Sequence, residues 1–217
     1  MNSQNPTNNR IGFAVSQCKA IQGCPKAVVD TSLVAESIAR VVEEMKLDEI
    51  IRHKFGERIA NHHVFDIVFS GCPNGCSKPQ INDLAIMARS IVEVNLDQCI
   101  SCMRCLNVCK EDAIDFIDQK IVINQDHCVG CDECVRVCPT SAIENLDTGY
   151  RILVGGKLGR HPQLAVEAVP FVKGEEVEDI VRQIITYFKE YSLKHERFGD
   201  LIKRTGIEAL QEYLSVR

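Results

Sequence analysis

Apolar residues recur at the spacing of an amphipathic helix in several stretches of the chain. One helix is predicted to begin at Asp30, Thr31 or Ser32, which are residue types that cap helix N-termini. Its apolar stripe consists of Val34, Ile38, Val41, Val42 and Met45. Further helices are predicted from Asp48 to about Asn61, after Gly174, and over about 206–214. These stripes predict ordinary packing against a core.

Shorter apolar runs predict strands between these helices. Val64 to Phe69 ends just before Gly71 and is predicted to be a buried strand that leads into a cysteine-containing loop. Two more strands are predicted over 91–94 and 151–154, and residues 79–87 are predicted to form a helix or a turn. Because strands alternate with helices, the expected fold class is α+β, or α/β-like.

Composition narrows the class of protein. The chain has 217 residues, of which 45% are hydrophobic and 25% charged, so it can fold around a substantial core. Its net charge of -5 argues against nucleic acid as the main partner. The polar residues 1–10 are expected to be a disordered tail, without a secretory signal. No apolar run is long enough to predict a membrane span, and we expect a cytoplasmic protein.

Eight of the twelve cysteines form two copies of the pattern C-x2-C-x2-C-x3-C. This spacing is typical of bacterial two-cluster ferredoxins, in which the fourth cysteine of each run binds the other [4Fe–4S] cluster. The expected ligands of one cluster are Cys99, Cys102, Cys105 and Cys138. Those of the other are Cys128, Cys131, Cys134 and Cys109.

The two cysteine runs belong to an internal repeat. LDQCISCMRCLNVCKEDAIDF aligns with QDHCVGCDECVRVCPTSAIEN at an offset of 29 residues without a gap. A pair of zinc sites is the alternative, but zinc sites usually use two separated C-x2-C pairs. The repeat therefore predicts a two-cluster ferredoxin-like module over 96–146, and Asp147-Thr148-Gly149 predicts the turn that follows it.

The other four cysteines are Cys18 and Cys24, in C-x5-C, and Cys72 and Cys76, in C-x3-C. Four buried apolar thiols are the alternative interpretation. Both motifs, however, contain small or turn-forming residues that let a backbone approach a bulky inorganic cube. These residues are Gly23, Pro25, Gly71, Pro73 and Gly75. We therefore predict a third [4Fe–4S] cluster, held by these four cysteines.

The pairing of C-x5-C with SGCPNGCSKP resembles the sirohaem-dependent sulfite and nitrite reductases. Similar segments are FDIVFSGCPNGCSKPQINDLAIM, GYRILVGGKLGRHP and ERFGDLIKRTGIEAL, so the resemblance covers about residues 11–217. An inserted ferredoxin module is similar to that of the anaerobic and dissimilatory-type sulfite reductases. The resemblance implies a discontinuous reductase-like domain of the C-terminal sirohaem-reductase type, over 11–95 plus 147–217, with the ferredoxin-like domain inserted at 96–146.

The resemblance also implies a role for the C-x3-C motif. In this family the last of the four cysteines bridges the cluster to the sirohaem iron, which implies that Cys76 is the bridge. Asn74 would lie near the sirohaem carboxylates. Further candidates for sirohaem or substrate contacts are Gly155, Gly156, Lys157, Arg160, Arg10 and Lys19. The alternative for the GGKLGR segment is a solvated turn after a strand.

The implied activity is the six-electron reduction of sulfite, or of nitrite, with electrons from a donor protein passing through the ferredoxin-type clusters. Only seventeen residues precede Cys18, and Arg10 is the only basic residue among them. We therefore expect an open sirohaem pocket, a pocket completed by a homo-oligomer or a partner subunit, or no sirohaem. The last case gives the alternative function, an iron–sulfur subunit that passes electrons to a partner reductase.

Overall fold

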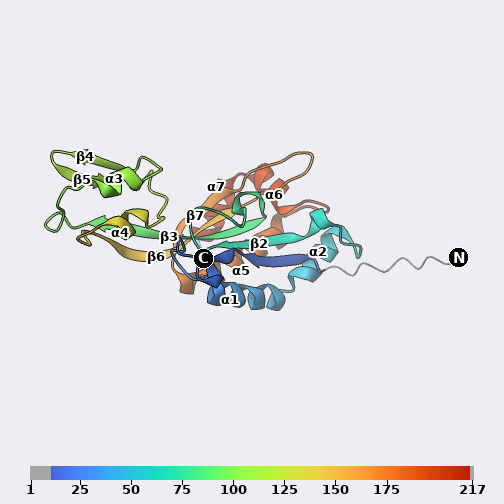
Figure 1. Cartoon of the computed structure of the whole chain (residues 1–217). Helices are drawn as coiled ribbons and strands as arrows, with labels where there is room; N and C mark the ends of the chain where they lie inside the picture. The colour runs from blue at the N-terminus through green and yellow to red at the C-terminus, as the bar shows by residue number, and fades with distance from the viewer. Residues whose placement is uncertain (1–10, 216–217) are drawn as a thin grey trace.

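A computed structural model describes residues 11–215 of the chain. The expected tail and the candidate residue Arg10 lie outside the described residues. Figure 1 shows a body and a smaller lobe at one end of it. The body is built on a five-stranded sheet with the strand order β1-β2-β3-β6-β7. Its strands are β1 (Phe13–Gln17), β2 (Phe65–Ser70), β3 (Leu84–Val94), β6 (Ile143–Val154) and β7 (Val166–Val172).

The sheet is mixed. Strands β1, β2 and β3 run parallel, whereas the β3–β6 and β6–β7 pairs are antiparallel. Helices α1 (Ser32–Glu44) and α2 (Leu47–Phe55) connect β1 to β2, since parallel neighbours need a crossover. The parallel strands β1 and β2 end at the same edge of the sheet, where Gln17 pairs with Phe69. The first and third cysteines of the scattered set, Cys18 and Cys72, follow at this edge.

One layer of helices covers one face of the sheet. It contains α1, α2, α5 (Val177–Tyr191), α6 (Phe198–Thr205) and α7 (Ile207–Ser215), which pack on one another and on the sheet. Alternate residues of β2, such as Phe65 and Ile67, point into this core. The opposite face holds a smaller cluster formed by Val68, Ala85, Met87 and Leu153. The molecule therefore has one thick core and one thinly covered sheet face.

The lobe contains its own hairpin and two short helices. They are β4 (Ile114–Ile117), β5 (Lys120–Ile123), α3 (Arg104–Val108) and α4 (Glu133–Val137). Strands β3 and β6 run without interruption from the body into the lobe (Figure 1), and a bulge at Ile91/Val92 marks the passage. The buried core of the lobe consists of Val92, Cys105, Ile114, Ile121, Cys134 and Ile143. The predicted domain boundary at 146/147 thus lies inside β6.

The repeat in the sequence appears as a twofold pattern in the lobe. The Asn95 amide donates to the carbonyl of Ala142 at 2.7 Å, and its repeat mate Asn124 donates to the carbonyl of Ala113 at 2.8 Å. Each asparagine also accepts, through its side chain, from the amide two residues later. The end of β3 is therefore the structural counterpart of β5, and the repeat begins before the first cysteine of each copy.

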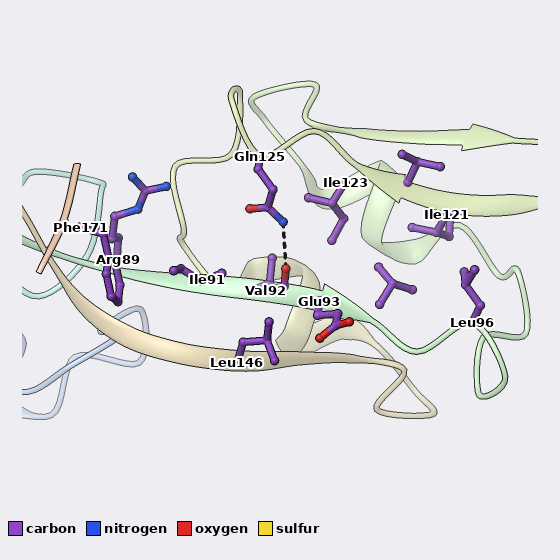
Figure 2. Close-up of a pocket in the computed structure, with 12 residues that line it drawn as sticks. Arg89, Ile91, Val92, Glu93, Leu96, Ile121, Ile123, Gln125, Leu146 and Phe171 are labelled. Carbon is purple, nitrogen blue, oxygen red and sulfur yellow. Dashed lines mark hydrogen bonds between the residues drawn. The ribbon is translucent and has the colours of Figure 1, made fainter. Parts of the chain in front are cut away.

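An apolar groove of about 530 Å³ lies at the junction of the lobe and the body. Figure 2 shows Val92 on β3, Leu146 on β6 and the β5 residues Ile121 and Ile123 along it. Val92 and Ile121 are repeat mates, and each also lines a cavity in the lobe that contains four cysteines. These two side chains therefore separate the groove from the cysteine cavities.

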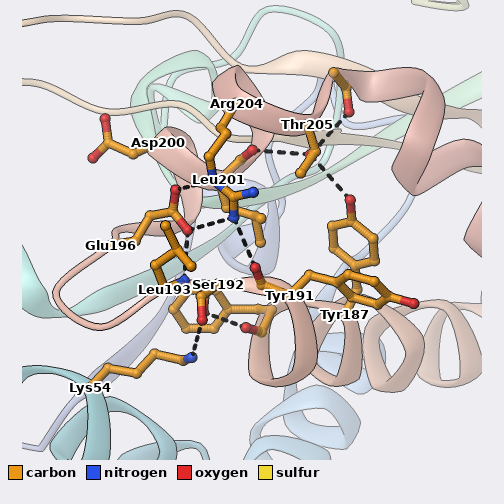
Figure 3. A network of polar contacts seen from close by, with 12 residues as sticks. Lys54, Tyr187, Tyr191, Ser192, Leu193, Glu196, Asp200, Leu201, Arg204 and Thr205 are labelled. Carbon is orange, nitrogen blue, oxygen red and sulfur yellow. Dashed lines mark hydrogen bonds and ion pairs between the residues drawn. The ribbon is translucent and has the colours of Figure 1, made fainter.

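Polar contacts tie the helical layer together at the C-terminal end of α5 (Figure 3). The buried Lys54 of α2 donates to the carbonyl of Ser192 at 3.2 Å, and its ammonium lies 5.2 Å from the ring centroid of Phe188. Burial lowers the pKa of Lys54. Arg204 of α6 donates to Glu196 at 2.7 Å and to the carbonyl of Tyr191, the last residue of α5, at 2.8 Å. These contacts satisfy helix-terminal carbonyls and fix α2 and α6 against α5.

Several predicted elements need correction. The prediction of a helix or turn over 79–87 is wrong, because only Pro79–Ile81 forms a 3₁₀ turn and β3 begins at Leu84. The second helix ends at Phe55 rather than near Asn61, since Gly56 has a φ of 90° that a helix cannot continue. The predicted strands at 91–94 and 151–154 are the ends of longer strands. Strands β1 and β7 were not predicted, whereas α6 lies in the segment ERFGDLIKRTGIEAL, which resembles the C-terminal helices of the family.

Candidate functional site

The scattered cysteines Cys18, Cys24, Cys72 and Cys76 come together at the carboxyl edge of β1 and β2. The amide of Cys18 donates to the carbonyl of Phe69 at 3.0 Å, which places the two motifs side by side. Burial raises the pKa of Cys72, and the charges of Cys18, Cys76 and Cys24 raise it further. Cys72 thus lies within electrostatic reach of the other three cysteines. Three thiols are half-buried, and Cys76 is exposed.

Two glycines make this approach possible. A Cβ atom on Gly71 would lie 2.3 Å from the Cβ atom of Ala20, so only glycine fits where the two cysteine loops meet. Gly75 has a φ of 62°, in the left-handed region, between Cys72 and Cys76. The small residues that the sequence singled out therefore have a direct steric purpose at these two positions.

Hydrogen bonds hold two of these sulfurs in place. The Gly71 amide donates to Cys18 Sγ at 3.2 Å, and Asn74 Nδ2 donates to Cys76 Sγ at 3.0 Å. Behind Cys76, Ser77 Oγ donates to the carbonyl of Phe69 at 3.0 Å and so fastens the loop to β2. N–H donors to ligand sulfurs are typical of iron–sulfur sites, where they tune the reduction potential. The donor set therefore fits a [4Fe–4S] cluster.

The lobe gathers the other eight cysteines into two cavities. One is bordered by Cys99, Cys102, Cys105 and Cys138, and the other by Cys109, Cys128, Cys131 and Cys134. Each cavity thus combines three cysteines of one run with the last cysteine of the other, as the spacing predicts. Burial raises the pKa of Cys134 to about 12, so a neutral thiol is favoured there unless a metal holds the thiolate.

The lobe thiols lie around cavities. Among the described residues, no three Cys, His, Asp or Glu side chains are placed to hold one metal ion. The eight lobe thiols instead surround cavities. The Ala142 amide also donates to Cys138 Sγ at 3.2 Å, which supplies an N–H···S contact in the lobe.

The glycine-rich loop after β6 packs on the chain that follows Cys76. The Gly155 amide donates to the carbonyl of Asp83 at 2.8 Å, and a Cβ atom on Gly156 would lie 2.6 Å from the carbonyl oxygen of Gln80. The Gln80 side chain in turn lies beside Gly75. Gly156 therefore packs on Gln80, whose side chain lies beside Gly75 of the C-x3-C loop, and Gly155 is held by Asp83.

The candidate cations are not equally available. Lys157 is buried and pairs with Asp200, and its backbone bridges to Gln163. Arg160 and Lys19 are exposed. The prediction that these residues contact an anion or sirohaem carboxylates stays a prediction, and for Lys157 it requires that the pair with Asp200 be shared or broken.

Other polar residues of the site have no signal in the sequence. Asp83 is fully buried, and burial raises its pKa to about 7 although Arg197 lies 3.9 Å away. Its carbonyl holds Gly155, so it supports the glycine-rich loop. Gln80 and Asp83 lie in the segment FDIVFSGCPNGCSKPQINDLAIM, but the resemblance gave them no role, because their contacts depend on β3 and β6 pairing far along the chain. Their roles follow only from the fold.

Four cysteines at the edge of a sheet, and eight more around two cavities of a repeated lobe, define an iron–sulfur protein. A family model described as the nitrite and sulphite reductase 4Fe-4S domain matches residues 13–217. The chain therefore belongs to this family. The resemblance noted from the GCPNGC motif is confirmed at the level of the family, as is the α+β fold class.

Named relatives agree with this assignment. The chain is 37% identical over 195 residues to a coenzyme F420-dependent sulfite reductase of Methanocaldococcus jannaschii, covering 89% of this chain and 29% of that protein. It is 27% identical to the alpha subunit of a dissimilatory-type sulfite reductase of Allochromatium vinosum, covering 94% and 41%. The chain thus spans less than half of these relatives.

Solved structures show the same fold. The crystal structure of dissimilatory sulfite reductase I matches with a TM-score of 0.66 at 21% identity, covering 94% of this chain and 52% of that one. In the part of the chain that the structure describes, no helix is both long and apolar enough to cross a membrane.

Proposed function

We propose that this chain carries the redox centre of a sulfite reductase. Electrons from a donor protein would pass through two ferredoxin-type [4Fe–4S] clusters in the lobe to a third cluster in the body, in a reducing cytoplasm. Sulfite is the preferred substrate because the relatives named above are sulfite reductases. Nitrite is the second substrate, since its reduction to ammonia uses the same number of electrons.

The ligand sets follow the cysteine groups of the fold. The body cluster would be held by Cys18, Cys24, Cys72 and Cys76. The lobe clusters would be held by the two crossed sets, each ending in Cys138 or Cys109. Support comes from the two lobe cavities, which are bordered by these sets, and from the electrostatic coupling of the body thiols.

The observation that carries the proposal is the exposure of Cys76 beside three half-buried thiols. A thiolate that is the ligand of a cube and also faces outward can bond a second iron. Cys76 would in this way join the body cluster to a sirohaem. When bound, this group would supply the iron that binds the substrate, and the clusters would deliver the electrons for bond cleavage. Asn74 would hold the Cys76 thiolate in this orientation through its 3.0 Å hydrogen bond.

The glycine-rich loop would provide the other contacts. The backbone of Gly155 and Gly156 packs against the segment after Cys76, so it can border a tetrapyrrole bound there. Arg160 and Lys19 are exposed cations that can pair with carboxylates or with a substrate oxyanion. Lys157 would join them only by sharing its charge with Asp200.

A second chain would complete the pocket. The sheet face opposite the helices carries only a small cluster, and Ala14 and Ser16 of β1 are exposed. Two of the relatives are named as single subunits of larger enzymes, one from the dissimilatory-type sulfite reductase of Allochromatium vinosum and one from the anaerobic sulfite reductase of Salmonella typhimurium. A partner protein, or another copy of this chain, would therefore cover this face and complete the sirohaem pocket.

One observation favours a second candidate function. Lys157 is already neutralised by Asp200, so the candidate cations do not form a prepared anion site. A chain with three clusters and no sirohaem would instead pass electrons to a partner reductase. The two functions make different spectroscopic predictions.

The decisive experiment is anaerobic purification followed by counts of iron and tetrapyrrole. The reductase predicts about thirteen irons, twelve in three clusters and one in the sirohaem, and one tetrapyrrole per chain, with tetrapyrrole absorption bands in the visible spectrum. Twelve irons without a tetrapyrrole, also after addition of sirohaem, would establish the electron-transfer subunit instead. Cys76→Ser should abolish sulfite reduction, whereas Cys102→Ser, an exposed lobe cysteine, should keep the tetrapyrrole and slow electron delivery. Normal turnover in Cys76→Ser would refute the bridge.

A further inference from the structure

One arginine of the lobe reaches across to the cysteine loop of the body. Arg136 lies on α4, between Cys134 and Cys138. Its guanidinium donates to the carbonyl of Ala27 at 3.2 Å and to that of Lys26 at 3.4 Å, just after Cys24. On its own side it donates to the carbonyl of Cys131 at 3.1 Å. One planar group therefore joins the backbones of two cysteine loops.

An ion pair reinforces this contact. Lys26 Nζ lies 2.6 Å from Glu133 Oε1, and the same carboxylate oxygen lies 3.3 Å from Arg136 NH1. The hydrogen bond from Lys26 lowers the pKa of Glu133. The Glu133 side chain is 24% exposed and the Lys26 side chain 60% exposed, so solvent screens the pair and the contacts of Arg136 dominate the network. Three residues from two parts of the chain thus form one network.

The rest of the same lobe loop is fixed to the body sheet. The Ser90 amide donates to the carbonyl of Gly130 at 3.1 Å, and Arg89 donates to the carbonyl of Cys128 at 3.1 Å. Asp132 accepts from Ser90 and from Asn145. The cavity of Cys109, Cys128, Cys131 and Cys134 is therefore the one on the body side of the lobe.

We propose that Arg136, supported by Glu133 and Lys26, is a positioning residue that holds the body-side lobe cluster next to the body cluster. The proposal rests on the proposed function only for the presence of the clusters. It assigns the order of electron transfer within the chain. The site of Cys99, Cys102, Cys105 and Cys138 receives electrons first, the body-side site passes them on, and the body cluster receives them last. Arg136 is not a cluster ligand. It acts by fixing the distance between the body-side lobe cluster and the body cluster.

The test compares Arg136→Gln with Arg104→Gln and Arg136→Lys. Arg104 is exposed on α3, the counterpart of α4, and its loss changes the net charge equally. In the cluster-loaded chain, Arg136→Gln should speed amide hydrogen exchange over residues 24–29 at least tenfold. It should also weaken the magnetic interaction between reduced clusters in electron paramagnetic resonance spectra. Arg104→Gln should change neither. Arg136→Lys should behave like Arg136→Gln, because a lysine cannot span both loops.

Each outcome decides the proposal. Unchanged exchange and unchanged magnetic coupling in Arg136→Gln would overturn it. Unaltered exchange and coupling in Arg136→Lys would also overturn it, because a positive charge alone would then be sufficient. If Arg136→Gln fails to bind its clusters, Glu133→Gln replaces it and should show the same two changes, about threefold in exchange. Absence of sirohaem would defeat the proposed reductase but leave this test intact, because both readouts report on the clusters alone.

Discussion

The two copies of the cysteine repeat share a backbone and differ in what they touch. Positive φ angles occur at matching positions, 52° at Ser101 and 70° at Gly130, and again 59° at Met103 and 63° at Asp132. In the first copy Met103 is exposed and Ile100 is 64% exposed. In the second copy Gly130 and Asp132 are buried against β3.

This difference distinguishes the backbone conformation of the loop, which both copies share, from its side chains, which they do not. The matched backbone is what three cysteines in C-x2-C-x2-C need in order to converge on one cube, so both copies keep it. The other side chains depend on the neighbour. The second copy has Gly130, Asp132 and Arg136 where it meets the body, and the first copy has Ser101, Met103 and Asn107 at the same positions. The copy with exposed apolar residues is accordingly the one that meets solvent.

The largest effect is expected from Gly130→Ala. A Cβ atom there would lie 2.4 Å from the carbonyl oxygen of Ser90, and the backbone has a φ of 70°. Two backbones must then separate, which should cost about 3 kcal/mol and lower the denaturant midpoint of the cluster-loaded chain under anaerobic conditions. Its repeat mate offers the control: Ser101→Ala should shift the midpoint very little. Equal midpoints for the two variants would remove the asymmetry between the copies.

A smaller loss is expected from Asp132→Ala. This buried carboxylate accepts from Ser90 and Asn145, and its removal leaves those donors unsatisfied, at about 2 kcal/mol. The same unfolding measurement on Met103→Ala, the matching position of the first copy, should show almost no change. A larger loss in Met103→Ala would mean that the first copy is anchored as well.

Ile121→Val should have a still smaller effect. Ile121 is 4% exposed and lies between the apolar groove and the cavity of Cys99, Cys102, Cys105 and Cys138. Loss of one methyl group should cost about 1 kcal/mol and admit solvent toward that cavity. Bleaching of the cluster absorption in air should then be faster than in Val122→Ala, a change at an exposed neighbour. Similar bleaching in both variants would contradict the separating role of Ile121.

The mildest test uses the unaltered protein. Cys102 is exposed, whereas the corresponding Cys131 is half-buried beside Arg136. During slow oxidation in the presence of a chelator, iron should leave the site that contains Cys102 a few-fold faster than the site that contains Cys131. Mössbauer spectra of samples taken during the loss should show one lobe site emptying before the other. Simultaneous loss would indicate equal access.

The sequence predicts the grouping of the cysteines better than the contacts between distant parts of the chain. The spacing of the cysteines predicts both crossed sets, and the structure places each set around one cavity. Strand β3 was missed over 84–90 because a continuous apolar run does not separate a strand buried on both faces from a helix. Arg136 and Asp200 have partners more than forty residues away, so no local pattern could reveal their contacts.

Strands β3 and β6 pair with each other from Leu84 and Val154 at one end to Val94 and Ile143 at the other. The lobe is thus an extension of the body sheet and has no flexible tether. Carrier domains that swing between donor and acceptor are slowed by viscous solvent, because their motion displaces it. Under the proposed function, electron passage within this chain would require no such excursion, so its rate should stay constant in glycerol while the encounter with an external donor slows.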